Sequence, residues 1–292
     1  MYKNIHNRCA LAWGCLAGVL SPAAVTADDR MADFPGRATA RENRRALSTD
    51  RPDQTESPYT VEAGHFQIEA DVFNFAFDHD PAAGADVRTT NRSYAALNLK
   101  AGLTNRMDLQ LIVNPHEVTR TERTEDRLNG SVTETSGFGD VTTRLKFNFW
   151  GNDGGRTALG LMPFIKWPLA ASVMRNGKTE GGIIVPFAVD LPGEVGLGAM
   201  TEVDWISDGA GGYDLAWLNS ITLSRNLGGR LGGYVELVAV AGNAPGCKWQ
   251  GQFDLGLTYA WSDDLQWDAG CNFGLTRSAP DYQPFAGVSR RF

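Results

Sequence analysis

Charged side chains alternate with apolar ones along much of the sequence, and these charges are the first candidates for chemistry. In the segment 140–149, Arg144 and Lys146 share one parity while Leu145 and Phe147 share the other. Successive side chains of a β-strand point to opposite faces, so such charges gather on one face of the sheet. A face lined in this way can orient ions and dipolar solutes.

The charges on this face are sorted by sign along the chain. Basic ones come from early segments, and acidic ones come mainly from later segments and from the first. We therefore expect a basic wall opposite an acidic wall, although such charges could equally pair across a filled interior. The predicted lining residues are Glu69, Asp71, Lys100, Asp108, Arg144, Lys146, Lys166, Asp190, Glu202, Asp204, Glu236, Asp254 and Asp268.

The elements that must position these residues are short strands joined by alternating links. Tight links of a few residues alternate strictly with longer polar links near 80–90, 119–137, 169–182, 207–213, 242–249 and 276–283. This is the hairpin pattern of an all-β, up-and-down antiparallel transmembrane β-barrel, here of about twelve strands. The predicted strands lie near 64–79, 91–103, 107–118, 138–150, 157–168, 183–191, 194–206, 214–225, 230–241, 250–261, 265–275 and 284–292.

A soluble β-sandwich also alternates, and the tryptophans favour the membrane barrel over it. Seven of the eight tryptophans lie at or near predicted strand ends, in two groups, as expected for girdles at two membrane interfaces. The short-turn group is Trp150, Trp261 and Trp267, and the long-link group is Trp167, Trp205, Trp217 and Trp249.

Some residues do not fit a regular barrel. Pro163 and Pro186 fall inside strands, where they cannot donate to the ladder, so we expect bulges there. Phe73, Phe75 and Phe77 share the parity of inward-facing polar residues. Either a bulge switches the face of the strand, or the three rings line the interior.

The N-terminal region divides into two parts before the barrel. Residues 1–27 have the basic start, apolar run and small-residue end of a signal peptide. Its removal changes the net charge from −7 to −9, because Lys3 and Arg8 leave with it. Residues 28–63 are expected to be a polar periplasmic segment or a plug, and 64–292 the barrel. The stretch 30–51 carries a net charge of +3, so we expect it near the acidic half of the interior.

Catalytic and metal sites are not indicated. The three histidines after residue 27 are His65, His79 and His116, and no serine shares the strand of His116 to act as a nucleophile. No Cys, His or Asp cluster has zinc spacing, and no nucleotide-binding glycine motif is present. Cys247 and Cys271 could pair or remain free. The sequence therefore predicts no enzyme, no metal and no cofactor, and its acidic charge argues against nucleic acid as a partner.

A family resemblance lies at the entry to the first strand. The stretch Ser48–Val72 contains Asp50-Arg51-Pro52-Asp53, then Ser57-Pro58, then Gly64-His65-Phe66-Gln67-Ile68-Glu69. It resembles the bacterial outer-membrane transporter family of the MetA pathway of phenol degradation. A second patch, Gly137-Phe138-Gly139-Asp140-Val141, resembles the family's glycine-flanked segment. The resemblance implies passage of small, often aromatic, hydrophobic compounds across the outer membrane.

The motif Asp50, Arg51, Pro52 and Asp53 is itself interpreted as a structural latch. A proline between acidic residues suggests a rigid turn with a locally paired arginine, placed at the periplasmic mouth of the barrel.

The sequence thus predicts an outer-membrane channel or transporter of a Gram-negative bacterium, for passive passage of small and possibly aromatic solutes. The alternatives are a structural or adhesive barrel with a blocked lumen and, third, an outer-membrane lipid hydrolase. Both termini are expected on the periplasmic side. The expected partners are outer-membrane lipid, the small-molecule solute and the barrel-assembly machinery, which would recognise the final strand ending in Phe292.

Overall fold

Fifteen antiparallel strands form one sheet that closes on itself when β15 pairs with β1. The computed structural model describes residues 44–81, 86–124, 130–171 and 177–292. The strands are β1 (Phe66–Asp80), β2 (Asp86–Tyr94), β3 (Leu97–Thr104), β4 (Met107–Val113), β5 (His116–Thr124), β6 (Gly130–Gly137), β7 (Val141–Trp150), β8 (Thr157–Trp167), β9 (Glu180–Leu191), β10 (Val195–Ser207), β11 (Tyr213–Gly228), β12 (Leu231–Gly242), β13 (Gln250–Ser262), β14 (Leu265–Gly274) and β15 (Tyr282–Arg291).

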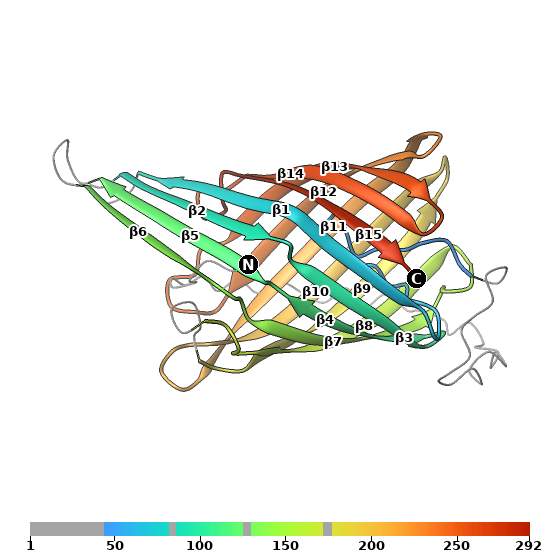
Figure 1. Cartoon of the computed structure of the whole chain (residues 1–292), viewed down its shortest axis with the longest axis horizontal. Coiled ribbons are helices and arrows are strands. Elements are labelled where there is room, and N and C mark those ends of the chain that lie inside the picture. The colour runs from blue at the N-terminus through green and yellow to red at the C-terminus, as the bar shows by residue number, and fades with distance from the viewer. Residues whose placement is uncertain (1–43, 82–85, 125–129, 172–176) are drawn as a thin grey trace.

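These fifteen strands make a barrel of twelve staves, as the sequence predicts. Three staves are each broken once along their length, so that β2 continues into β3, β4 into β5, and β6 into β7. The remaining strands are single staves that pair with their sequence neighbours (Figure 1). Among the described residues, no helix is long and apolar enough to cross a membrane.

Beyond the broken staves, the sheet continues outside the barrel as a projecting tongue, visible at the left of Figure 1. The tongue consists of β2, β5, β6 and the end of β1, with β2 paired to both β1 and β5. The predicted links 80–90 and 119–137 are therefore wrong as loops over much of their length. Their threonines favour strands, and Arg120 pairs with Glu122 and Glu134 across and along the tongue.

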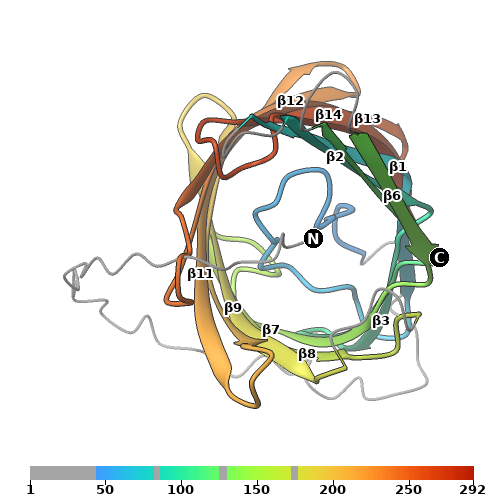
Figure 2. The ribbon, with the colours of Figure 1, turned by 90° about the vertical axis from the view of Figure 1, so that its left-hand side faces the viewer.

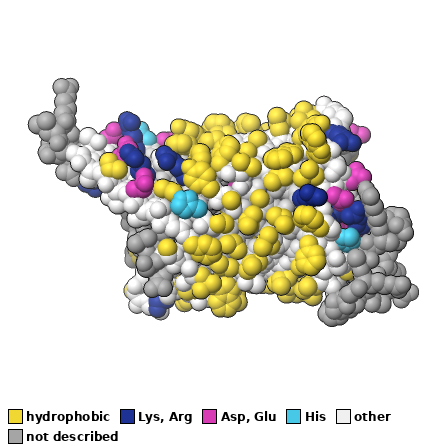
Figure 3. Space-filling model, in the orientation of Figure 1, with side chains coloured by type: hydrophobic (Ala, Val, Ile, Leu, Met, Phe, Trp, Pro, Cys, Tyr) yellow, Lys and Arg dark blue, Asp and Glu magenta, His cyan; other side chains and the backbone are white. Residues whose placement is uncertain are grey.

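The outer surface of the barrel is apolar and the inner surface is mostly polar. On β13, Leu255 and Leu257 are exposed on the outside of the barrel. Asp254, which directly precedes Leu255, is completely buried inside it. Figure 3 shows the apolar side chains as a broad band across the visible face of the barrel, with most charged groups beyond its two edges. This distribution is typical of a barrel whose wall faces lipid.

The residues that do not fit a regular barrel pattern are accommodated in two different ways. A register shift between Asp71 and Phe73 switches the face of β1, so the phenylalanines point outward and Phe77 stacks on the exposed ring of Tyr282. The bulges expected at Pro163 and Pro186 are wrong, because the β8–β9 register continues unshifted past both prolines.

Candidate functional site: the filled lumen

Residues 44–63 lie inside the barrel as an irregular segment, which we call the plug (Figure 2). An irregular backbone in a closed space needs partners for its polar groups. The wall supplies them: the Asp108 carboxylate accepts from the Val61 backbone N–H at 2.9 Å, and the Asn148 amide donates to the Pro58 carbonyl at 2.9 Å. The rest of the predicted N-terminal segment, 28–43, and the signal peptide lie outside the described residues.

The basic side of the lumen is neutralised by Asp50 of the plug. The Lys100 ammonium lies 2.6 Å from one Asp50 oxygen, and Lys146 lies 2.5 Å from the other. Lys100 also pairs with Glu69, whose carboxylate accepts from the Asp50 backbone N–H at 3.1 Å. Burial alone would raise the pKa of Asp50, yet the two ammonium groups outweigh it and hold that pKa well below its usual range.

Arg51, the next residue of the plug, binds acidic residues of the wall. Its guanidinium donates to both oxygens of Asp268, at 2.7 and 3.2 Å, and pairs with Asp71. The expected local pairing with Asp50 or Asp53 is therefore wrong. All four residues of the motif lie in the plug inside the lumen, where Asp50 bonds lysines of β3 and β7 and Arg51 bonds acidic residues of β1 and β14.

The acidic side of the lumen receives hydrogen-bond donors from the plug. One Glu236 oxygen accepts from the Gln54 backbone N–H at 2.9 Å and the other from the Thr55 N–H at 2.8 Å. The Gln54 side-chain amide donates to Asp254 at 2.7 Å. The Thr55 hydroxyl lies 2.7 Å from the Ser220 hydroxyl. The plug is thus matched to each wall, with carboxylates on the basic side and donors on the acidic side.

The other predicted lining residues lie at different heights. Arg144 pairs with Glu56 of the plug. Glu202 and Asp204 are buried further along β10. Lys166, at the end of β8, bonds Glu180 at 2.9 Å, away from the plug. Asp190 is exposed near the opposite end of the barrel.

Inward-facing glycines provide the space that the plug occupies. A Cβ added at Gly102 would collide with the Glu62 carbonyl oxygen, and one at Gly287 would collide with the Arg51 guanidinium. A Cβ at Gly198 would lie 3.2 Å from the Thr55 methyl carbon. Backbone and side chain of the plug therefore approach the wall more closely than any residue with a side chain would allow.

An apolar cluster on the inner wall is the feature that sequence reasoning missed. Its members come from five adjacent strands, β8 to β12, and all are at most 8% exposed. We call it the luminal patch; it consists of Met162, Ile184, Met200, Leu218, Val238 and Val240, with Phe164 packed against it. A signal existed in the sequence, because 183–189 and 237–241 are apolar at both parities. An alternating barrel strand has no need of apolar residues on its inner face.

The seven predicted girdle tryptophans are all at least 36% exposed. Trp150 ends β7, while Trp261 and Trp267 flank the turn between β13 and β14. The others lie toward the opposite ends of their strands, at Trp167, Trp205, Trp217 and Trp249. Indole rings placed at two levels of an apolar wall suit two membrane interfaces.

Cysteine and metal chemistry contribute nothing visible to this site. Cys247 is buried and Cys271 is half-buried, and the two do not form a disulfide with each other. Within the described ranges, no group of three or more His, Cys, Asp or Glu side chains is arranged to hold a metal ion.

Solved structures share this fold at low sequence identity. An outer membrane channel from Pseudomonas putida F1 has a TM-score of 0.61 and 13% identity, over 84% of this chain and 100% of that chain. The transport unit of the autotransporter AIDA-I from Escherichia coli has a TM-score of 0.51 and 11% identity, over 84% of this chain and 92% of that chain. Both are outer-membrane barrels, so this chain has the fold of a β-barrel of the Gram-negative outer membrane.

The sequence comparisons give the family. No curated protein matches the chain. The family model described as "Putative MetA-pathway of phenol degradation" matches residues 49–292, which comprise most of the plug and the whole barrel. The matched range begins at Thr49, so the plug motif belongs to the pattern together with the wall that binds it. The chain belongs to the outer-membrane β-barrel family of the MetA pathway of phenol degradation.

Proposed function

We propose that the protein is a channel for the passive passage of small hydrophobic or aromatic compounds across the outer membrane. The luminal patch carries this proposal. Met162, Ile184 and Met200 are inward-facing and fully or almost fully buried, in a position where barrels normally carry polar groups. Family membership and the similarity to an outer membrane channel of Pseudomonas putida F1 support the same function.

The physical reason is the affinity of an apolar wall for an apolar solute. Removing apolar surface from water stabilises a solute by roughly 25 cal/mol per Å². A patch built from five strands thus offers a binding step inside a lumen that is otherwise charged. A sugar or an ion would gain nothing from it, so the patch discriminates in favour of aromatic and aliphatic compounds.

The plug covers the luminal patch in the structure. The Glu56 backbone N–H lies 3.3 Å from the Met200 sulfur, and Pro58 lies against Gly160 on β8. Passage along the patch therefore requires the plug to shift. The same observation favours a second candidate function, a structural or adhesive barrel whose lumen stays blocked.

Uptake by cells that lack their general porins distinguishes the two candidates. We expect the protein to raise phenol and toluene uptake, and Leu218→Asn to lower it severalfold without affecting glucose uptake. Asn272→Ala, a luminal substitution on β14 outside the patch, is the matched control. Phenol and toluene uptake no faster than in cells without the protein would establish the blocked barrel.

As a channel, the protein would not be an enzyme. The His116 ring lies against the Tyr94 ring on the tongue, with centroids 6.2 Å apart. In the portion of the chain that the structure describes, no serine hydroxyl hydrogen-bonds this imidazole, which a lipid hydrolase of the Ser–His type would require. Assay of the purified protein with phospholipid and ester substrates tests this part of the proposal.

The proposed function includes an orientation of the barrel in the outer membrane. We place the short turns and both termini on the periplasmic side and the tongue outside the cell, because outer-membrane barrels have short periplasmic turns and longer external links. The exposed Phe292 would then be available to the barrel-assembly machinery, and the tryptophan girdles to lipid. Protease digestion of intact cells should cut the tongue near residues 119–137 and leave the C-terminus intact.

A further inference from the structure

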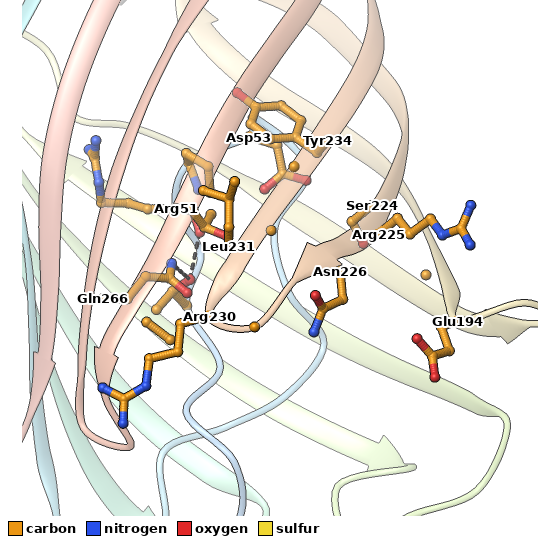
Figure 4. Close-up of a pocket in the computed structure, with 18 residues that line it drawn as sticks. Arg51, Asp53, Glu194, Ser224, Arg225, Asn226, Arg230, Leu231, Tyr234 and Gln266 are labelled. Atoms are coloured by element: carbon orange, nitrogen blue, oxygen red, sulfur yellow. Dashed lines mark hydrogen bonds between the residues drawn. The ribbon is translucent and has the colours of Figure 1, made fainter.

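A cavity of about 450 Å³ lies beside the plug at the short-turn end of the barrel. We call it the vestibule. One side is formed by the plug, from Thr49 to Asp53, and the other by β11, β12 and β13 (Figure 4). Gly196 and Gly232 on the wall leave this space open. The volume is several times that of a water molecule, so a small organic molecule fits.

The inner end of the vestibule combines a carboxylate with an aromatic ring. Asp53 and Tyr234 lie side by side in Figure 4. Asp53 accepts a hydrogen bond from Thr222, and Glu236 is its close neighbour. Glu236 in turn lies directly opposite Asp254 in the β12–β13 register. Three carboxyl groups therefore meet behind the cavity.

These carboxyl groups have no cationic partner among the described residues. The basic groups of the lumen are engaged elsewhere, Lys100 and Lys146 with Asp50 and Arg51 with Asp268. Burial, reinforced by the adjacent Glu236, raises the pKa of Asp53 well above its usual range. The three carboxyl groups thus have no basic partner in the described part of the chain, and a bound cation would compensate them in place of the proton that Asp53 otherwise holds.

Two buried polar atoms at the same place also lack hydrogen bonds. They are the Tyr234 hydroxyl oxygen and one carboxylate oxygen of Asp254, and the two residues are 7% and 0% exposed. The Tyr234 ring is held flat by Gly256, where a Cβ would come within 2.6 Å of it. Buried groups of this kind normally have partners, so the orphaned hydroxyl of Tyr234, which lines the vestibule, indicates a ligand position.

We propose that the vestibule binds a small organic ammonium ion, with its charge at Asp53 and its apolar body against Tyr234 and Pro52. The ammonium group supplies donors to the carboxylate and approaches the Tyr234 ring, a geometry that attracts cations. Pro52 and the Tyr234 ring line the vestibule and give it an apolar side that a hydrated inorganic ion would not use. The site does not depend on passage through the lumen, so it stands apart from the proposed function.

Equilibrium binding to the purified full-length protein in detergent tests the site, with benzylammonium as the probe and benzyl alcohol as its uncharged counterpart. We expect one saturable site at which benzylammonium binds at least tenfold more tightly than benzyl alcohol. Asp53→Asn should remove this difference. Asp208→Asn, in an exposed link at the other end of the barrel, should keep it.

A locked variant separates loss of the site from displacement of the plug. A disulfide between cysteines at positions 55 and 220, where the native hydroxyl oxygens are 2.7 Å apart, holds the plug against the wall. Asp53→Asn should weaken benzylammonium binding in this background as well, and Tyr234→Leu should weaken it further. Equal affinity for the two probes, or unchanged binding by locked Asp53→Asn, overturns the proposal. Neither result bears on phenol uptake, which tests the channel.

Discussion

The carboxylate of Asp50 in the plug lies 2.5 Å from the ammonium of Lys146 in the wall. The Lys146 side chain is 0% exposed, and Lys100, on the other oxygen of the same carboxylate, is 2% exposed. Neither lysine has water to solvate its charge. Plug and barrel are therefore electrostatically dependent on each other, because Asp50 of the plug supplies the carboxylate that both buried lysines bond.

Replacement of Asp50 should consequently release the plug. Asp50→Asn removes the carboxylate that Lys146 bonds and leaves it only the electrostatic interaction with Asp108 of the adjacent strand, and breaking a buried ion pair costs about 3–5 kcal/mol. Lys100 retains Glu69, so the barrel itself should stay folded. We expect larger single-channel conductance in planar bilayers together with a lower Tm. Asp208→Asn is the control for an exposed carboxylate, and wild-type conductance in Asp50→Asn would show that the plug is held by other contacts.

A reversible lock tests whether the plug moves during passage. The variant with Thr55→Cys and Ser220→Cys joins plug and β11 covalently under oxidising conditions, because the native hydroxyl oxygens are only 2.7 Å apart. We expect phenol uptake to fall when the disulfide forms and to recover after reduction. The two single cysteine variants control for the substitutions. If the oxidised variant transports at the full rate, solute passes beside a stationary plug.

A single methyl group should also displace the plug. Gly102→Ala places a Cβ against the Glu62 carbonyl oxygen and 2.8 Å from that of Val61, and neither backbone atom can rotate away. We expect conductance to rise toward that of a variant lacking 44–63, with the barrel still resistant to unfolding by detergent. Gly232→Ala is matched to it, because its nearest obstacle is the movable Thr258 hydroxyl. Equal conductance in the two variants would mean that the plug adapts locally.

The wall of this barrel is predictable from sequence because apolar and polar residues alternate within each single strand. Each strand alternates within about ten residues, so the lipid-facing side, the girdles and the number of staves follow without tertiary information. The luminal patch is not recognisable in the same way. Where both parities are apolar, as around Ile184, alternation cannot tell the inner face from the outer one. The prediction misses the tongue for the converse reason. Strands such as β6 are polar on both faces, so their sequence resembles that of a loop.

The sequence suggests a plug as one of two alternatives, but the contacts of the plug cannot be inferred from it, for a different physical reason. Its contacts are made by an irregular backbone, which has no period from which to infer a partner. Arg51 bonds Asp268 across 217 positions, although Asp53 is only two residues away. Burial decides the outcome, because Asp268 is held inside the barrel with a side chain 0% exposed, where an unpaired carboxylate is costly.

The pH dependence of the channel should follow the carboxyl groups of the plug. Burial raises the pKa of Asp53 and also that of Glu56, for which it outweighs the nearby Arg144. A carboxyl with a raised pKa in the seated plug binds its proton more tightly there than in the free plug. Lower pH therefore favours seating, from the raised values down to the free carboxyl pKa of about 4. Asp50 has the opposite sign, but its stabilisation is lost only below that point.

Between pH 8 and pH 5 we thus expect conductance to fall as the solution becomes more acidic, measured in bilayers at constant ionic strength. Asp53→Asn removes one of the two groups with a raised pKa and should make the dependence shallower. Asp50→Asn should raise conductance at every pH in this range without changing the slope, because Asp50 stays ionised throughout. Conductance that stays constant or increases on acidification in this range would show that proton uptake by Asp53 and Glu56 does not govern the position of the plug.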